Sequence, residues 1–83
     1  MRIKLLRHVN EQAKERGIDI GLIKETLSNP EQIAPDLNEL KIAQRRYLDK
    51  DKQYLIRVIF KEGKDLRIGI TVYKTSKLKK YWR

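Results

Sequence analysis

The stretch YLIRVIFKEGKDLRIGITVY, residues 54–73, decides the fold of this chain. Residues 54–60 are apolar except for Arg57, which is typical of a central strand covered on both faces. Glu62-Gly63-Lys64 predicts a turn, and residues 66–73 then alternate as a second strand does. The alternation predicts an inward set (Leu66, Ile68, Ile70 and Val72) and an outward set (Arg67, Gly69, Thr71 and Tyr73). Together they predict an antiparallel hairpin.

A third strand is predicted upstream, over residues 40–48, joined to this hairpin by the charged loop 49–53. Alternation places Leu40, Ile42, Gln44, Arg46 and Leu48 on one side, and Lys41, Ala43, Arg45 and Tyr47 on the other. The proline-containing piece 31–35 is expected to be an edge strand or a connector.

The first half of the chain is predicted to be helical. Apolar residues recur at the spacing of one helical face over residues 4–16, and Gly17 supplies a left-handed stop. Asp19 is expected to cap a second helix, which Asn29-Pro30 ends.

The predicted fold class is therefore α+β in a single domain, residues 1–83, with a basic tail over 74–83. Two N-terminal helices pack on one face of a three- to four-stranded antiparallel sheet, the uncertain strand being 31–35. A chain of 83 residues has room for one small core only.

Charge is unevenly distributed along the chain. Lys and Arg number 20 against 11 Asp and Glu, for a net charge of +9. Residues 1–40 hold six basic and seven acidic side chains, whereas residues 41–83 hold fourteen basic and four acidic ones. Such a one-sided positive field favours a polyanion, most often nucleic acid. A solvated surface that only aids solubility is the alternative.

Composition excludes several classes of site. The chain has no cysteine and a single histidine, which rules out disulfides, thiolate metal sites and multi-histidine metal sites. No apolar run approaches the roughly 18 residues that a membrane span needs. We expect a soluble cytoplasmic protein with no metal, no cofactor and no membrane partner.

A phosphate-binding surface is expected on the sheet face that the helices leave free. If the helices cover the aliphatic side, that face shows Arg45, Tyr47, Arg57, Arg67, Thr71 and Tyr73. Arginine offers planar donors to phosphate oxygens, and tyrosine rings give single-stranded bases a surface on which to stack. Ordinary exposed strand residues are the alternative interpretation, because Tyr and Thr favour strands.

His8 is the only side chain whose ordinary pKa suits proton transfer near neutral pH. The chain has neither a glycine-rich phosphate loop nor a nucleophile elbow, so the enzymology left open is metal-independent. RNA cleavage fits, because the 2′-hydroxyl is an internal nucleophile and the protein supplies only proton transfer and cations. A boundary residue of the first helix is the simpler interpretation of His8.

Three stretches of the sequence resemble a known family. They are RHVNEQAKERGIDIGLIKETLSNPEQI (7–33), RRYL (45–48) and IGITVYKTSKLKKYW (68–82). Their order and spacing are similar to a small domain family related to the RelE/ParE-type and BrnT-type toxins of toxin–antitoxin systems. Those toxins share the fold of microbial ribonucleases, in which helices pack on a four-stranded antiparallel sheet.

The resemblance implies a metal-independent endoribonuclease toxin, acting on RNA or ribosome-bound mRNA and held inactive by a cognate antitoxin. It implies that His8 exchanges protons, that Arg46 or Arg45 together with Arg57 holds the phosphate, and that Thr71 hydrogen-bonds it. The residues expected to bind RNA are Arg45, Tyr47, Arg67, Tyr73, Lys74, Lys77, Lys80 and Tyr81. RelE-type enzymes place their catalytic residues mainly on the sheet and the C-terminal tail, and ParE-type relatives are not ribonucleases.

Two other functions remain open from the sequence. The same basic face would serve a non-catalytic RNA-binding or regulatory module, or a domain that binds an acidic protein. For the tail, a disordered cationic end is the alternative to RNA binding, although Trp82 is expected to dock somewhere.

Overall fold

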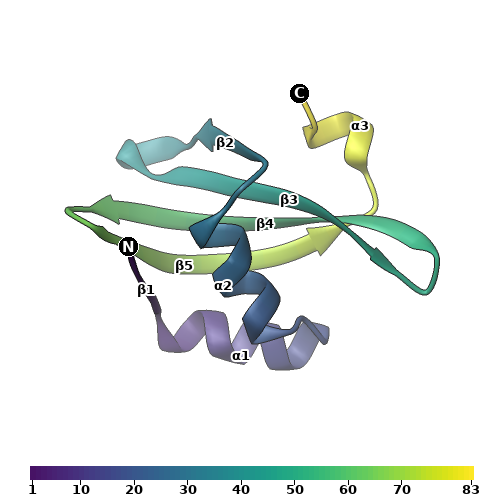
Figure 1. The fold of residues 1–83 in the computed structure, drawn as a ribbon, viewed down its shortest axis with the longest axis horizontal. Coiled ribbons are helices and arrows are strands. Elements are labelled where there is room, and N and C mark those ends of the chain that lie inside the picture. Colours follow the sequence, from purple (N-terminus) through teal and green to yellow (C-terminus); the bar gives the residue numbers. More distant parts are fainter.

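The structure, a computed structural model, describes residues 1–83 and is an α+β domain with one five-stranded mixed sheet (Figure 1). The strands are β1 (Arg2–Leu5), β2 (Gln32–Pro35), β3 (Lys41–Asp49), β4 (Lys52–Gly63) and β5 (Leu66–Thr75). The helices are α1 (Arg7–Arg16), α2 (Ile20–Ser28) and α3 (Leu78–Tyr81), with a 3-10 turn η1 (Leu37–Glu39). None of these helices is long and apolar enough to cross a membrane.

The strand order is β1-β5-β4-β3-β2, so the predicted hairpin forms the middle of the sheet. Its neighbours β3 and β2 follow antiparallel, and β2 confirms the expected edge strand. The β3–β4 turn has positive φ at Lys50 and Asp51, the two-residue geometry that matches strand twist.

The prediction of a purely antiparallel sheet that follows two N-terminal helices was wrong. Residues 2–5 form strand β1, which runs parallel to β5, and α1 begins only at Arg7. Ile3 and Leu5 point to the core with a period of two, and Leu6 N–H donates to the Gly69 carbonyl at 3.1 Å. Pairing with β1 therefore satisfies backbone groups at this edge of β5, which would have lacked this partner if residues 2–5 were helical.

The helices end as their sequences predict. Gly17 adopts φ 63° after α1, and Ile18 N–H returns to the Ala13 carbonyl at 2.8 Å. The Asp19 carboxylate accepts the Gly21 N–H at 3.1 Å, which confirms the predicted N-cap of α2. Asn29 follows the last residue of α2.

Both long helices pack on one face of the sheet, which we call the helix face. The core there is built from Val9, Ala13, Ile23 and Leu27 of the helices and Ala43, Ile56, Val58, Phe60 and Val72 of the strands. Helix α1 lies against β5, and α2 lies against β4 and β3 (Figure 1). Strand β1 covers the edge of β5 only at residues 66–69. Further along this edge, Gln12 of α1 accepts the Val72 N–H at 3.0 Å, and Arg16 donates to the Val72 carbonyl at 2.7 Å.

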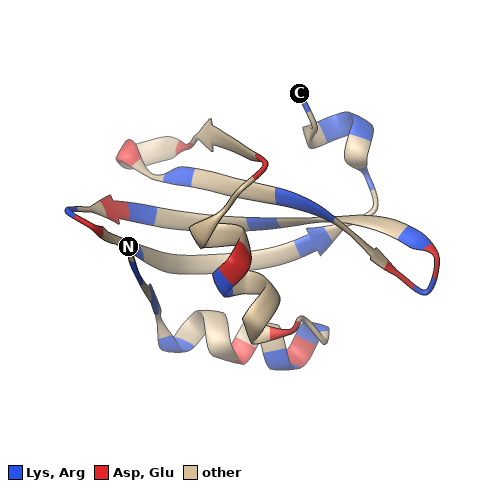
Figure 2. Cartoon of the chain, in the orientation of Figure 1, with Lys and Arg blue, Asp and Glu red and all other residues tan.

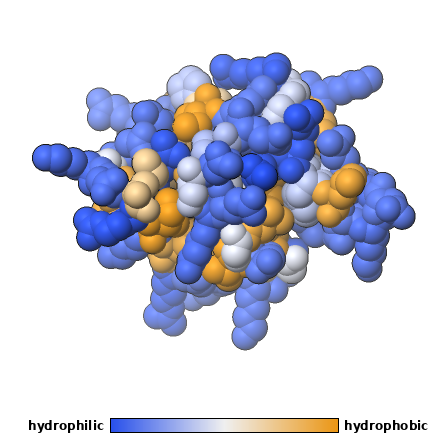
Figure 3. Space-filling view, viewed as in Figure 1, coloured by the Kyte–Doolittle hydropathy of each residue, from blue (hydrophilic) through white to orange (hydrophobic).

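The opposite side of the sheet, which we call the tail face, is covered only by the C-terminal segment. Helix α3 lies there, on the other side from α1 and α2 (Figure 1). Leu55 belongs to the tail face because it is paired with Arg46, yet its side chain is fully buried. On the side of the molecule seen in Figure 3, blue side chains interrupt the orange apolar patches.

A bulge changes which residues of β5 face the helices. Ile59 pairs with Thr71 and Phe60 with Gly69, which leaves Ile70 as the extra residue. Gly69 and Val72 therefore both lie on the helix face, whereas Leu66 and Ile68 lie on the tail face, opposite to their prediction. The bulge forms where the missing side chain of Gly69 lets Leu5, Leu27 and Val58 approach its backbone.

Gly69→Val is expected to lower the free energy of unfolding by about 1–3 kcal/mol, because overpacked cores strain their neighbours. A Cβ at this position would lie 2.9 Å from Leu5 Cδ2 and 3.2 Å from Leu27 Cδ1. Urea unfolding followed by circular dichroism measures the change. The matched control is Gly21→Ala, whose Cβ would meet only Asp19 at 3.6 Å, and which should be neutral or stabilising by up to about 1 kcal/mol. Equal stability of the two variants would contradict this account of the bulge.

Candidate nucleic-acid interface

Arg57 lies at the centre of the tail face. It is paired with Gln44 on β3 and with Tyr73 on β5, so the three side chains form one row across the sheet. Arg57 Nε donates to Gln44 Oε1 at 3.0 Å, and Nη1 donates to the Tyr73 hydroxyl. The Arg57 side chain is thus fixed by two strands.

The Arg57 guanidinium is a buried cation without a carboxylate partner. The residue is only 8% exposed, and it forms none of the ion pairs in the structure. A desolvated charge is costly unless an opposite charge or a full set of hydrogen bonds compensates it. Its neighbours here are an amide, a phenol and aromatic rings, so a bound anion would supply the missing charge.

The C-terminal tail covers this row. The Tyr81 ring centroid lies 4.0 Å from Arg57 Cζ, and the Trp82 ring centroid lies 4.1 Å from Arg46 Cζ. Rings at this distance attract a guanidinium electrostatically. The expectation that Trp82 docks is confirmed, and the tail is not a disordered cationic end.

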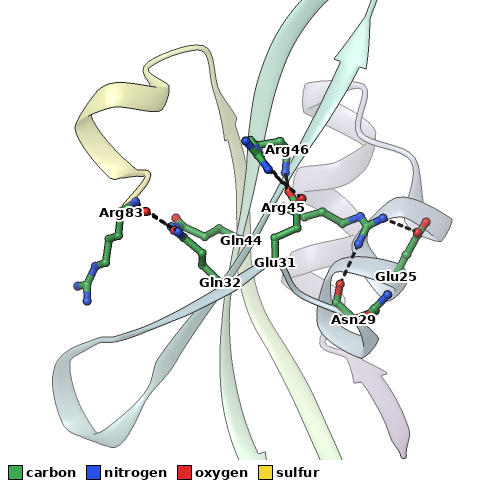
Figure 4. Close-up of polar contacts among 8 residues, drawn as sticks. All are labelled: Glu25, Asn29, Glu31, Gln32, Gln44, Arg45, Arg46 and Arg83. Atoms are coloured by element: carbon green, nitrogen blue, oxygen red, sulfur yellow. Dashed lines mark hydrogen bonds and ion pairs between the residues drawn. The ribbon is translucent and has the colours of Figure 1, made fainter.

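Two glutamines hold the tail in place (Figure 4). The fully buried Gln44 donates from Nε2 to the Tyr81 carbonyl at 3.1 Å and to Gln32 Oε1 at 2.7 Å. Gln32 in turn accepts the Arg83 N–H at 3.1 Å and donates to the Arg83 carbonyl at 2.7 Å. Neither glutamine was identified from the sequence. A signal was present, because Gln44 alternates with Ile42 and Arg46 on the side of the strand that was assigned to the core, where a polar residue is unexpected.

Arg46 borders the row and carries its own counter-ion. Glu31 accepts the Arg46 backbone N–H at 2.7 Å and faces its Nη2 at 3.3 Å (Figure 4). The side-chain hydrogen bond from Arg46 lowers the pKa of Glu31 below its ordinary value, helped by the backbone hydrogen bond. Thr71 also lies on the tail face, because it is paired with Ile59.

Four of the residues predicted to bind RNA lie instead on the helix face. Arg45, Tyr47, Arg67 and Lys74 are paired there with Ile56, Tyr54, Glu62 and Ile56, respectively. The predicted face was wrong for the β3 residues because Ala43, not Ile42, enters the helix-side core. It was wrong for Arg67 because the bulge reverses the faces of β5 residues that precede it.

The two misassigned arginines already have partners in the fold. Arg45 bridges Glu25 at 3.1 Å and the Asn29 carbonyl at 2.9 Å (Figure 4). Arg67 bridges Glu62 and the Leu27 carbonyl, each at 2.7 Å. Its hydrogen bond holds the pKa of Glu62 below the ordinary value. These contacts tie α2 to the sheet.

Tyr47 is an aromatic contact beside the core. Its ring stacks on Tyr54 with centroids 5.7 Å apart, and burial raises the pKa of its hydroxyl. Lys74 Nζ lies 5.3 Å from the same Tyr54 ring. Neither residue shares a face with Arg57.

His8 is not brought to the predicted phosphate-binding residues. It is exposed on α1, and α1 packs on the helix face. Arg46, Arg57 and Thr71 all lie on the other side of the sheet. A single reaction that uses His8 and these three residues has no support from this geometry.

The lysines of the tail line a shallow groove beside α3. Its volume is 620 Å³, and its walls are Gln53, Ser76, Lys77, Leu78, Lys79 and Lys80. No acidic residue takes part, and α3 shows only blue among its charged positions in Figure 2. Lys77 and Lys80 therefore have the surroundings expected of phosphate contacts.

Comparison with protein-family models, with curated proteins and with solved structures yields no match to this chain. No cluster of three or more His, Cys, Asp or Glu residues is placed to hold a metal ion. The interpretation of the tail face thus depends on its own geometry.

Gln44→Leu is expected to lower the free energy of unfolding by about 1–3 kcal/mol, because it leaves the buried Arg57 Nε without an acceptor. Urea unfolding measures the change. The control is Gln53→Leu, on the same face but exposed and without a hydrogen-bond partner, which should change stability little. If both variants unfold alike, Gln44 does not hold the row together.

The ion pair of Arg46 with Glu31 should make stability depend on acid pH. Because the folded pKa of Glu31 is lowered, its contribution is complete above the unfolded pKa of about 4.3 and is lost as the pH falls through the folded value. The difference in urea midpoint between the wild type and Glu31→Gln should therefore shrink on acidification. The control Glu15→Gln removes an exposed carboxylate without an ion pair and should show no such change.

Proposed function

We propose that the protein binds single-stranded RNA on the tail face and cleaves it as a metal-independent endoribonuclease of the toxin type. The observation that carries the proposal is the buried Arg57 guanidinium, which has hydrogen bonds to Gln44 and Tyr73 but no carboxylate. A phosphodiester supplies the missing anion, with planar donors available to two of its oxygens. Arg46, Thr71 and the lysines of the α3 groove extend the contact.

In this proposal the 2′-hydroxyl attacks the adjacent phosphorus, the bond to the 5′-oxygen breaks, and a 2′,3′-cyclic phosphate and a 5′-hydroxyl result. Arg57 stabilises the charge that develops on the phosphate. The attacking hydroxyl must lose a proton and the leaving oxygen must gain one. Tyr73 takes the role of proton carrier, since its hydroxyl contacts Arg57, and His8 does not.

The resemblance to RelE-like and BrnT-like toxins supports a cognate antitoxin as partner. Such a protein would be small and acidic enough to cover the basic tail face, and a reading frame next to this one would encode it. Ribosome-bound mRNA is the substrate that the ribosome-dependent members of such families suggest.

A non-catalytic RNA-binding module is the second candidate function. It is favoured by the separation of His8 from the arginines and by the ring of Tyr81 over Arg57. This module would bind RNA through the same residues with a salt dependence set by the number of phosphate contacts, and would leave it intact.

Incubation of the purified protein with RNA in EDTA, followed by mapping of the ends, tests the two functions. Cleavage is expected to leave 2′,3′-cyclic or 3′-phosphate ends, to fall on the order of a hundredfold or more in Tyr73→Phe, and to persist in His8→Ala. Loss of cleavage in His8→Ala with Tyr73→Phe active would contradict the role of Tyr73. RNA that is bound but uncut by the wild type indicates the binding module.

Binding is measured on the same proteins by fluorescence anisotropy of labelled RNA across salt concentrations. Arg46→Ala should weaken binding and reduce the salt slope by about 0.7 for one lost phosphate contact. The matched control Lys24→Ala removes an exposed charge of α2 on the helix side and should leave the slope unchanged. Absence of binding by the wild type would contradict both functions.

A further inference from the structure

The last residues of the chain contact the tail face in a way that imitates a ligand. Two consecutive rings, Tyr81 and Trp82, each lie over one guanidinium, that of Arg57 at 4.0 Å and that of Arg46 at 4.1 Å. Guanidinium planes are also surfaces on which unstacked RNA bases lie. The tail thus occupies two stacking positions at once.

The two guanidiniums, those of Arg46 and Arg57, lie close enough together to contact neighbouring units of one chain. Arg46 is paired with Leu55, and Gln44 is paired with Arg57, so the two arginines are diagonal neighbours across β3 and β4. Such residues have Cα atoms about 7–8 Å apart on one face of a sheet. Two successive units of one chain, whether residues or nucleotides, can therefore cover both guanidiniums.

We propose that Tyr81 and Trp82 occupy the positions of two neighbouring nucleobases, so that single-stranded RNA binds only by displacing the tail. This inference rests on the proposed function and adds an internal competitor to it. The tail provides rings but no anion for Arg57, whereas RNA provides both bases and phosphates. The ligand therefore satisfies the buried cation better than the tail does.

The attachment of the tail is suited to release. Only the amides of Gln32 and Gln44 hold its backbone on the sheet, through Tyr81 and Arg83, and no ion pair joins the tail to the domain. Helix α3 has four residues and none of them is buried. Lifting residues 81–83 alone uncovers Arg57 without disturbing the helix-side core, and leaves the lysines of the α3 groove available to the phosphates.

Gln32→Ala tests the proposal because it removes the two hydrogen bonds between β2 and Arg83. It neither changes the charge of the protein nor removes a ring. The probe is a short 2′-O-methyl RNA, which lacks the attacking hydroxyl and stays intact. Gln32→Ala should bind it on the order of fivefold more tightly than the wild type, since a larger fraction of the protein is open. Tyr81→Ala and Trp82→Ala should also bind more tightly.

Trp82 reports on the tail directly, because it is the only tryptophan of the chain. Acrylamide should quench its fluorescence more strongly after RNA is added to the wild type, and more strongly in Gln32→Ala even without RNA. The matched control is Asn10→Ala, which truncates an exposed amide of α1 on the helix side and should match the wild type in affinity and quenching.

The outcomes separate the two proposals. Weaker binding by Tyr81→Ala and Trp82→Ala, or protection of Trp82 from acrylamide by RNA, would mean that the rings bind RNA themselves and would overturn the competition. Equal binding by all variants with unchanged quenching would overturn it too and leave RNA binding intact. If no protein binds, including Gln32→Ala with its tail released, the proposed function itself fails.

Discussion

One buried amide connects the parts of the tail face. Gln44 accepts from Arg57 on β4 through Oε1, and donates through Nε2 to Gln32 on β2 and to the Tyr81 carbonyl in the tail. Arginine has donors only, so the oxygen of Gln44 must face Arg57, and its nitrogen is left for the tail. Because Arg57 can only donate, it determines which way the amide of Gln44 faces, and so the direction of the hydrogen bonds from Gln44 to Gln32 and Tyr81.

Arg57 differs from the other arginines of the central strands in having no carboxylate partner. On the helix face, Arg45 and Arg67 bridge carboxylates and helix carbonyls, and so contribute to tertiary structure. On the tail face, Arg57 has no carboxylate at all. The arginines that hold α2 on the sheet are thus neutralised, whereas the central, buried Arg57 is not. This asymmetry gives the charge a functional interpretation that its total does not.

Much of the fold follows from local sequence patterns. Gly17, Asp19 and Asn29 end or begin helices by local chemistry, and the strands β3, β4 and β5 lie where alternation or apolar runs predict them. Strand β1 was missed because four residues next to a helical pattern are too few to distinguish the alternation of a strand from the spacing of a helix. Its partner, β5, lies more than sixty residues away along the chain. Nothing local to residues 2–5 specifies that pairing.

The face of each strand residue was harder to predict than the strand itself. Alternation gives two classes of residue but does not say which class faces the helices, and choosing Ile42 over Ala43 reversed the assignments of Arg45 and Arg46. The bulge at Ile70 reversed part of β5 in the same way. Arg57, Thr71 and Tyr73 were placed on the correct face, so the centre of the site was predictable while its border was not.

The tail resolves a conflict within the site. The buried guanidinium of Arg57 binds a phosphate more readily without a carboxylate beside it, because that partner would compete for the same few free donors. Without one, the buried charge destabilises the fold. The amide of Gln44 and the ring of Tyr81 stabilise Arg57 with neutral groups, and an anion can displace the ring. Tail docking and phosphate binding satisfy the same cation, and for that reason they exclude each other.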